Sequence, residues 1–299
     1  MIPPSPTVPS PYASRLAALP QEEHSVEVLG SSTHYWVYGP RDARVTLVAV
    51  HGFRGEHHGL EPVVAHLHDV RVIAPDLPGF GDSPALGGRE HSTATYAEWL
   101  GAFLRALGLG DDVVILGHSF GSIVTSAALA SGVKASKLIL VNPIAAPALK
   151  GPRGIATRLA IFYFWLGAVL PERVGLGLLR NGVIVRLSTG SMIKSKSASL
   201  RRWINDQHDV YFSRFATRQV VLESFKASVS SDVSTYASRI HTPTLLIAAD
   251  RDDITALPAQ YELQKLFPNA RLAVIEGVGH LIHYEKPAEA AAAIEGFLA

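Results

Sequence analysis

The sequence predicts an α/β protein with a mostly parallel central sheet flanked by helices, and with a second, helical segment inserted into it. Between Val45 and Ile144, short apolar runs alternate with helical patterns, which is the arrangement that builds a parallel sheet. About 100 residues then separate the strand ending near Asn142 from the one starting at Thr244, far more than a crossover helix needs. The chain has 299 residues, 47% of them hydrophobic, so it can bury a sizeable core.

The central strands are predicted from runs that are rich in β-branched residues or leucine and lack polar alternation, as expected for strands buried on both faces. These runs are residues 45–50, 70–74, 113–116 and 138–141. A helix is expected behind a cap at Ser92, and Gly108 ends it. Residues 25–29 and 34–38 alternate more, which suits antiparallel strands at one edge of the sheet.

The pattern resumes late in the chain with a strand at 244–248, a helix near 258–267, a strand at 271–275 and a final helix from Pro287. We therefore expect a core made of residues 1–143 and 241–299, and a helical insert at 144–240. The insert holds 14 Lys or Arg and 5 Asp or Glu, a net charge of +9; because the whole chain carries +1, the core carries −8.

Composition and charge exclude several classes of protein. A net charge of +1 gives no support for a nucleic-acid partner. The chain has no cysteine, so disulfides, a thiol nucleophile and cysteine-ligated zinc are excluded. The opening residues 1–6 lack the basic start of a secretory signal and are predicted to form a loose arm. The longest apolar stretch, residues 159–170, falls short of the roughly 20 residues of a membrane span, so a cytoplasmic protein is expected.

The most specific motif is Gly117-His118-Ser119-Phe120-Gly121, which follows an apolar strand and precedes a helical stretch. It fits a nucleophile elbow, a strained turn that exposes the serine hydroxyl. The N–H of Phe120 and the positive end of the helix dipole are then aimed where negative charge develops on a tetrahedral intermediate. The alternative is a glycine-rich turn with an idle serine.

At this motif the sequence resembles the α/β-hydrolase superfamily, from about residue 25 to the end. His51-Gly52-Phe53 follows the third strand, where that family places its oxyanion loop, so the resemblance implies that Phe53 N–H is the second donor beside Phe120. The segment from Asp76 to Ser83 is similar to the family's turn after the fourth strand, which implies a structural role for it.

The resemblance also implies the base and the acid that a serine nucleophile requires. His280, in the loop between the last strand and the last helix, is similar to the family's catalytic histidine, and His283 is expected to pack or cap. Matching Ala249 to the family's usual glycine puts the acid at Asp252, with Asp250 and Asp253 as alternatives. The order Ser119, Asp252, His280 is the one that this fold requires.

In this family, an insert at 144–240 forms a lid that selects the substrate. We expect Phe162 and Trp165 to line a substrate pocket, with anchoring of the lid as the alternative. Arg54, next to the oxyanion loop, binds an acidic substrate group or pairs with a core carboxylate. The basic excess of the insert attracts an acidic substrate, favours peripheral contact with an anionic membrane, or forms a solvated face.

No cofactor or metal is implied. Glu56, His57 and His58, and the later His66 and His68, lack the spacing of a known ligand set and are interpreted as surface and helix-start histidines with a neighbouring acid. No phosphate-binding or dinucleotide-binding glycine motif is present.

The sequence therefore predicts a serine hydrolase that cleaves a small-molecule carboxylic ester, apolar or acidic, through an acyl-enzyme intermediate. A carbon-carbon bond hydrolase acting on acidic diketones is the first alternative, since it would give Arg54 a role. Thioesterase and acyltransferase activities use the same residues, and a ligand-sensing relative without turnover is a further alternative.

Overall fold

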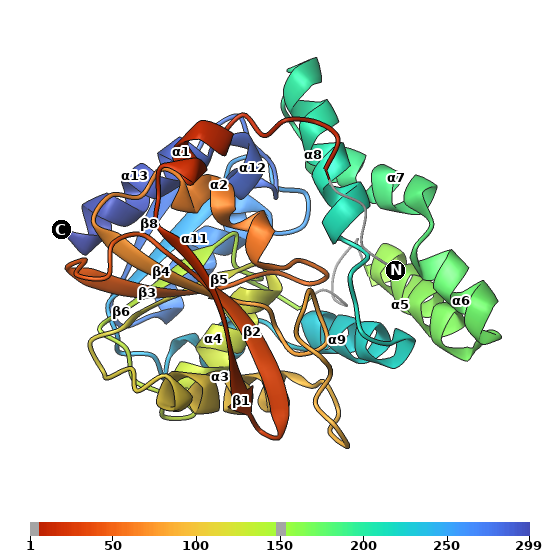
Figure 1. The fold of residues 1–299 in the computed structure, drawn as a ribbon, viewed down its shortest axis with the longest axis horizontal. Coiled ribbons are helices and arrows are strands. Elements are labelled where there is room, and N and C mark those ends of the chain that lie inside the picture. Colours follow the sequence, from red (N-terminus) through yellow and green to blue (C-terminus); the bar gives the residue numbers. More distant parts are fainter. Residues whose placement is uncertain (1–5, 148–153) are drawn as a thin grey trace.

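In the computed structural model, residues 6–147 and 154–299 are described, and they contain one eight-stranded sheet (Figure 1). The strands in chain order are β1 (Gln21–Val28), β2 (Ser31–Tyr38), β3 (Val45–Val50), β4 (Val70–Pro75), β5 (Val114–His118), β6 (Lys137–Val141), β7 (Thr244–Ala249) and β8 (Ala270–Ile275). Their order across the sheet is β1-β2-β4-β3-β5-β6-β7-β8. The strands β1 and β2 pair antiparallel at one edge, and all pairs from β4 to β8 are parallel, which confirms the predicted α/β class.

Helices bury both faces of this sheet, which explains why its strands are continuously apolar. Val48 and Val50 of β3 point to one face and Leu47 and Ala49 to the other. The first face is covered by α3 (Thr93–Ala106), α4 (Phe120–Ala130) and α11 (Leu257–Leu266). The second face is covered by α2 (Glu61–Val64) and α13 (Pro287–Leu298). The predicted cap of α3 is confirmed, because the Ser92 hydroxyl accepts the Thr95 N–H at 3.2 Å.

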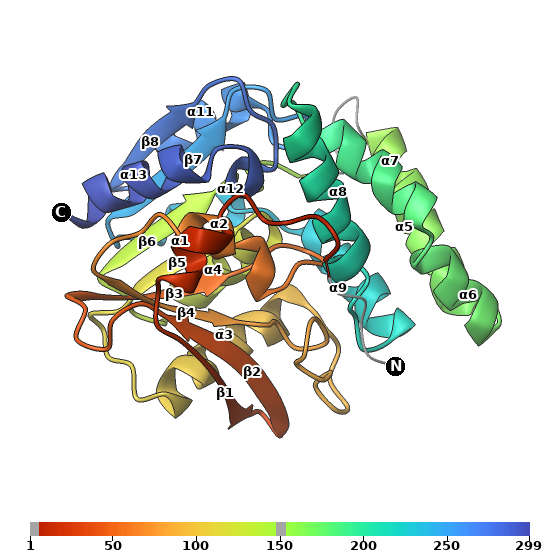
Figure 2. The ribbon, with the colours of Figure 1, turned by 45° about the horizontal axis from the view of Figure 1, so that its top comes forward.

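Between β6 and β7, the described part of the chain forms helices and no strand. These helices are α5 (Gly154–Val169), α6 (Glu172–Leu179), α7 (Gly182–Met192), α8 (Ala198–Tyr211), α9 (Arg218–Ser230) and the short α10 (Ser234–Ala237). In both views, α5 to α8 lie together on one side of the sheet-containing core (Figures 1 and 2). Within the described ranges, no helix is long and apolar enough to cross a bilayer.

The N-terminal segment bridges the core and α8. Residues 1–5 of the loose arm predicted for residues 1–6 lie outside the described residues. Thr7 and Val8, which follow it, are hydrogen-bonded to α8. The N–H groups of Thr7 and Val8 donate to the Asp206 carboxylate of α8 at 2.9 and 3.0 Å. Tyr12, just before α1 (Ala13–Ala17), packs edge-on against Trp203 of α8 and donates its hydroxyl to the Tyr284 carbonyl, in α12 (Ile282–Glu285).

The turn from β5 into α4 is held by two glycines that have no room for a side chain. Ser119 itself lies in the left-handed region, with φ 53° and ψ −116°, a strained backbone for a residue with a Cβ. A Cβ on Gly121 would lie 2.3 Å from the Val50 carbonyl oxygen, and one on Gly117 would lie 2.5 Å from the Gly121 carbonyl oxygen. The start of α4 therefore packs directly on the carboxyl end of β3, which confirms the predicted strand-turn-helix context.

Replacing Gly121 with alanine should lower the free energy of unfolding by at least about 2 kcal/mol, because the new methyl group must push two rigid backbone segments apart. Chemical denaturation measures this change. The matched control is Gly296→Ala in α13, where a Cβ meets nothing within 4 Å. There, the helix should gain up to about 1 kcal/mol. Wild-type stability in the Gly121 variant would contradict the close packing.

Candidate active site

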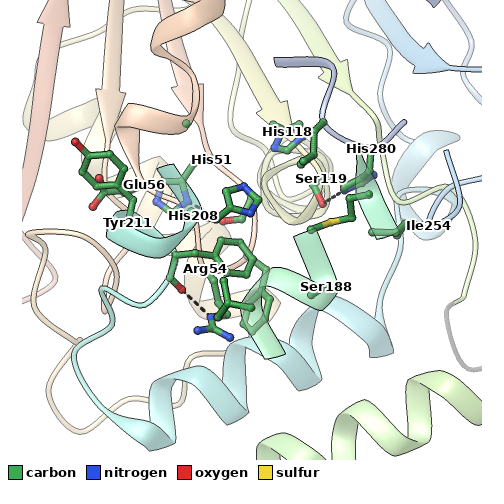
Figure 3. Close-up of a pocket in the computed structure, with 18 of the residues that line it drawn as sticks. His51, Arg54, Glu56, His118, Ser119, Ser188, His208, Tyr211, Ile254 and His280 are labelled. Carbon is green, nitrogen blue, oxygen red and sulfur yellow. Dashed lines mark hydrogen bonds between the residues drawn. The ribbon is translucent and has the colours of Figure 1, made fainter. Parts of the chain in front are cut away.

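Ser119 lies at the carboxyl end of β5 and lines a cavity of about 530 Å³. One side of the cavity is formed by the loops after β3, β5 and β8, and the other by α5, α7, α8 and α9 (Figure 3). Because the carboxyl ends of parallel strands meet at one edge of the sheet, residues far apart in the sequence surround this serine.

His280 is within hydrogen-bond reach of the serine. Its Nε2 lies 2.8 Å from Ser119 Oγ, and Figure 3 shows the two side chains pointing at each other. The loop that carries His280 is held by Asn142 at the end of β6, whose Nδ2 donates to the His280 carbonyl at 2.8 Å and whose Oδ1 accepts the Ala249 N–H at 3.1 Å. The sequence analysis assigned Asn142 no role beyond the end of a strand, and these two bonds show that it holds the histidine loop in place.

Asp252 is the carboxylate that contacts His280. Its Oδ2 accepts from His280 Nδ1 at 2.7 Å and from the Thr255 hydroxyl at 2.7 Å, and its Oδ1 accepts the N–H groups of Ile254 and Thr255. Burial by itself would raise the pKa of this carboxyl, but the neighbouring His280 and the bonds from Thr255 outweigh it and lower the pKa to about 2. Asp252 is therefore ionised at any pH at which His280 acts as a base.

The alternatives to these residues have other contacts. Asp250 accepts the Val278 N–H at 3.2 Å, and Asp253 forms an ion pair with Lys194. His283 is buried and packs against the ring of His118, with 4.2 Å between the ring centroids. The geometry thus brings together Ser119, His280 and Asp252 and leaves the other candidates out of hydrogen-bond contact with the serine.

Two backbone N–H groups are available next to Ser119. Gly52 lies close to Ser119: a Cβ added to this glycine would be 3.2 Å from Ser119 Cβ. Phe53, the next residue, therefore lies beside the serine. Among the described residues, Phe53 N–H donates to no protein acceptor, and Phe120 opens α4, where N–H groups lack intrahelical partners. The loop is positioned by His51, which accepts the Leu77 N–H on Nε2 and donates from Nδ1 to the Gly52 carbonyl, both at 2.8 Å.

Comparison with known proteins decides the family. A model of the alpha/beta hydrolase family matches residues 47–293, most of the chain. The chain belongs to the alpha/beta hydrolase family. It is 25% identical over 270 residues to N-formylmaleamate deformylase of Pseudomonas putida, covering 87% of this chain and 90% of that protein. It is also 27% identical over 242 residues to 2-hydroxymuconate semialdehyde hydrolase of Pseudomonas putida, covering 77% of each.

Solved structures agree on the fold. An esterase from Exiguobacterium antarcticum superposes with a TM-score of 0.75 at 18% identity, covering 93% of this chain and 99% of the esterase. At that identity the likeness shows the fold alone. The chain is thus an alpha/beta hydrolase. The bond that it cleaves depends on the residues that line its own cavity.

The walls of the hydrolase cavity are mostly apolar, and three of the histidines in them, His118, His208 and His283, have lowered pKa values. Burial, together with the nearby His280, lowers the pKa of His118 to about 3, and burial likewise lowers the pKa of His208 to about 3. The pKa of His283 is also lowered by burial and by the neighbouring histidines. These rings therefore contribute no positive charge that would attract an anionic substrate.

Arg54 lines the cavity and pairs with no carboxylate among the described residues, which corrects one of the two interpretations made from the sequence. Its Nε donates to the Phe212 carbonyl at 2.8 Å, and its Nη2 donates to the Leu179 carbonyl at 3.0 Å and to the Ser213 hydroxyl. The guanidinium also lies 4.8 Å from the centroid of the Phe212 ring. Arg54 thus joins the core loop to the helical insert, and its role in binding an acidic substrate group stays a prediction.

Phe162 and Trp165 do not line the cavity, which corrects the prediction that they do. They stack on each other with their ring centroids 5.7 Å apart and are 56% and 44% exposed. The residues of α5 that line the cavity are instead Leu159, Ala160, Tyr163 and Phe164, and Phe164 packs on Phe53 at 5.5 Å between ring centroids. Phe164 therefore does the anchoring that the sequence analysis offered as the alternative role for this segment.

The prediction that His57 and His58 are surface or helix-start histidines is correct in part. His57 does start a short 3-10 helix, but it is buried rather than on the surface. Potential ligand atoms of Glu56, His57 and His58 lie within 4.8 Å of one another. However, the Glu56 carboxylate is already bonded to His58 and Arg214, and His57 Nδ1 lies 2.9 Å from Asp76. Asp76 also accepts the N–H groups of His57 and Asp82, as expected for a residue that supports a turn.

Replacing Asp252 with asparagine should remove a pH-dependent part of the stability. The carboxyl binds its proton less readily in the folded chain (pKa about 2) than in the unfolded chain (about 3.8), so its ionised form stabilises the fold above pH 4, by about 2 kcal/mol, and this contribution is lost as the pH falls toward 2. The difference in unfolding free energy between wild type and Asp252→Asn should therefore shrink between pH 6 and pH 3.

Urea denaturation at several pH values measures this difference, and titration of the other carboxylates cancels because both proteins share them. The control is Asp112→Asn, an exposed carboxylate whose loss should change the unfolding free energy by less than about 0.5 kcal/mol throughout. A wild-type-to-variant difference that does not vary with pH would contradict the assigned contacts of Asp252.

Proposed function

We propose that this alpha/beta hydrolase cleaves carboxylic esters through an acyl-enzyme intermediate, with Ser119 as nucleophile, His280 as base and then acid, and Asp252 as the residue that orients His280. The observation that carries the proposal is the continuous chain of hydrogen bonds from Ser119 Oγ to His280 Nε2, 2.8 Å, and from His280 Nδ1 to Asp252, 2.7 Å. A serine hydroxyl is a weak nucleophile, and this arrangement is what activates it.

The reaction follows from these contacts. Ser119 Oγ attacks the ester carbonyl carbon while its proton passes to His280 Nε2, and Asp252 stabilises the resulting imidazolium. The carbonyl oxygen becomes an oxyanion, for which the N–H groups of Phe53 and Phe120 are the proposed donors. His280 then gives its proton to the departing alcohol. A water molecule repeats the sequence on the acyl-enzyme and releases the acid.

The cavity supports an uncharged, apolar substrate. Its walls carry aromatic and aliphatic side chains, His118, His208 and His283 have lowered pKa values, and Arg54 donates to protein carbonyls. In the proposal, residues 144–240 act as a lid, because α5, α7, α8 and α9 supply the cavity walls opposite Ser119. No nucleic-acid partner, metal or cofactor takes part, and the cytoplasmic location expected from the sequence stays a prediction.

The alternative, a carbon-carbon bond hydrolase, would use the same three residues. The similarity of the chain to 2-hydroxymuconate semialdehyde hydrolase supports it. Its specific support was Arg54 as the partner of an acidic substrate, and the bonds from Arg54 to Phe212, Leu179 and Ser213 leave it fewer N–H groups for that task. Ester hydrolysis is therefore preferred. Thioester hydrolysis and acyl transfer share the acyl-enzyme and differ only in the group that leaves or enters.

Replacing Ser119 with alanine should reduce hydrolysis of a short p-nitrophenyl ester by a factor of about 1,000 or more, because the attacking oxygen is removed while the fold keeps its contacts. Steady-state release of p-nitrophenol measures the rate, and circular dichroism checks folding. A phosphonate ester should label wild type at Ser119 and leave the variant unlabelled. The control is Ser131→Ala at the exposed far end of α4, which should keep wild-type activity. Retained turnover in the folded Ser119 variant would refute the assignment.

A substrate panel should separate the alternatives. We expect the highest kcat/KM for a neutral aliphatic ester, a lower value for its thioester, and the lowest for a vinylogous diketone acid, because the cavity walls are mostly apolar and Arg54 already donates to three protein acceptors. The measurement is kcat/KM for each class under one set of conditions. The diketone acid ranking first would overturn the ester assignment in favour of carbon-carbon cleavage, and release of one product per enzyme would indicate a ligand sensor.

A further inference from the structure

The outward side of α5 is apolar. Leu159, Phe162, Trp165 and Val169 are 64%, 56%, 44% and 54% exposed. Their spacing of three, three and four residues places them on one stripe of the helix. Since Tyr163 and Phe164 on the opposite side pack inward, this helix is apolar on both its inner and outer sides. A helix that is apolar on both sides is normally buried on both sides, but these four side chains are exposed to solvent.

The neighbouring helices extend this surface. Val174 of α6 is 56% exposed, and Val183 and Leu187 of α7 are 67% and 72% exposed. In both views, α5, α6 and α7 form the side of the molecule that faces away from the sheet (Figures 1 and 2). We call these seven residues the outer apolar face: Leu159, Phe162, Trp165, Val169, Val174, Val183 and Leu187.

The cavity opens at the edge of this face. Among the residues that line the cavity, those with exposed side chains are Leu159 of α5, Ser188 of α7 and Ile254 in the loop after β7. These residues therefore mark the mouth (Figure 3 shows Ser188 and Ile254 toward the same end of the cavity as Ser119 and His280). Leu159 belongs both to the cavity lining and to the apolar stripe. An apolar molecule can thus pass from the outer face to Ser119 along a path that begins at an apolar side chain.

Positive charge accompanies the outer apolar face. Arg158 on α5 and Arg173 on α6 are exposed, Arg186 on α7 is exposed and pairs with Asp209, and the segment 144–240 carries a net charge of +9. An apolar surface flanked by basic side chains is complementary to the interface of an anionic lipid membrane, where apolar residues enter the acyl boundary and arginines meet the headgroups. A second copy docking through the same face would instead oppose two positively charged segments.

We propose that the outer apolar face docks the mouth of the cavity on an anionic lipid surface, so that lipophilic esters enter the cavity from the lipid. The docking stands on the exposed side chains and charges alone, whereas the cleavage of the entering ester rests on the proposed function. The occupant is therefore a lipid surface, and the substrate class is an ester that partitions into it.

Vesicle flotation tests the docking. Wild type should float with vesicles of phosphatidylcholine and phosphatidylglycerol, and more weakly with phosphatidylcholine alone. The double variant Phe162→Gln/Trp165→Gln should bind the mixed vesicles at least about tenfold more weakly, because two large apolar side chains no longer enter the lipid. Its hydrolysis of soluble p-nitrophenyl acetate should stay at the wild-type level, since neither residue lines the cavity.

The matched control is Tyr261→Gln/Leu266→Gln on α11, which removes two exposed apolar side chains, 48% and 45% exposed, from a helix of the core. It should bind vesicles as wild type does. A second readout is intrinsic fluorescence: of the four tryptophans, Trp36, Trp99 and Trp203 are buried and Trp165 is exposed. Mixed vesicles should shift the emission to the blue in wild type and not in Trp165→Phe.

The outcomes separate the docking from the chemistry. The Ser119→Ala variant, which lacks the proposed nucleophile, should still float with the mixed vesicles. Loss of ester hydrolysis alone therefore does not contradict the docking proposal. Failure of wild type to float, or equal flotation of wild type and the Phe162→Gln/Trp165→Gln variant, overturns the proposal while leaving the hydrolase assignment intact. Dimerisation in sedimentation velocity that the double variant abolishes, without vesicle binding, would make a second copy the occupant and also overturn it.

Discussion

The contact between the first turn of α4 and the carboxyl end of β3 is the constraint on which the site depends. It exists because Gly121 has no side chain, so that the helix backbone reaches the carbonyl oxygens of Val50 and His51. The same contact puts Gly52 against Ser119 and forces the serine into a left-handed backbone conformation. One packing interaction thus sets the direction of the hydroxyl and brings the N–H of Phe53 beside it.

The histidine loop is held from two sides. On the core side, Asn142 bonds both the His280 carbonyl and the Ala249 N–H, so it ties the loop to the ends of β6 and β7. On the other side, the Glu285 carboxylate accepts N–H groups from Lys194 and Ser195 as well as from Gly279. A loop that carries a base has to keep its geometry within about 0.5 Å, and these bonds supply that rigidity without occupying the ring nitrogens.

The sheet and the turn that carries Ser119 were predictable from the sequence because they rest on strong local signals: apolar runs for β3 to β8, and glycines flanking Ser119 at a strand-to-helix turn. The preference for Asp252 over Asp250 and Asp253 came from the family resemblance and not from a local signal, because the contacts that distinguish Asp252 are the N–H groups of residues 254 and 255, which donate to its carboxylate. The inner face of α5 was also unpredictable. A helix that is apolar all round has no polar side to show its orientation, so Phe162 and Trp165 were assigned to the wrong face.

Arg54 shows a different reason for an incorrect assignment. Its partners are backbone carbonyls at 179 and 212, and a backbone carbonyl leaves no trace in the residue pattern. Sequence reasoning considered only acidic side chains or an acidic substrate as partners for it. Other bonds between the insert and the core do use acidic side chains, as those from Arg214 to Glu56 and Asp82 show.

The N-terminal segment has a consequence for how the chain is made. Thr7 bonds to Asp206, 199 positions later, and Tyr12 packs on Trp203. During synthesis, residues 7–12 therefore emerge long before their partners on α8, and the Tyr284 carbonyl that accepts the Tyr12 hydroxyl follows later still. Until then their apolar side chains stay open to solvent, so this segment can settle only after distant parts of the polypeptide have been made.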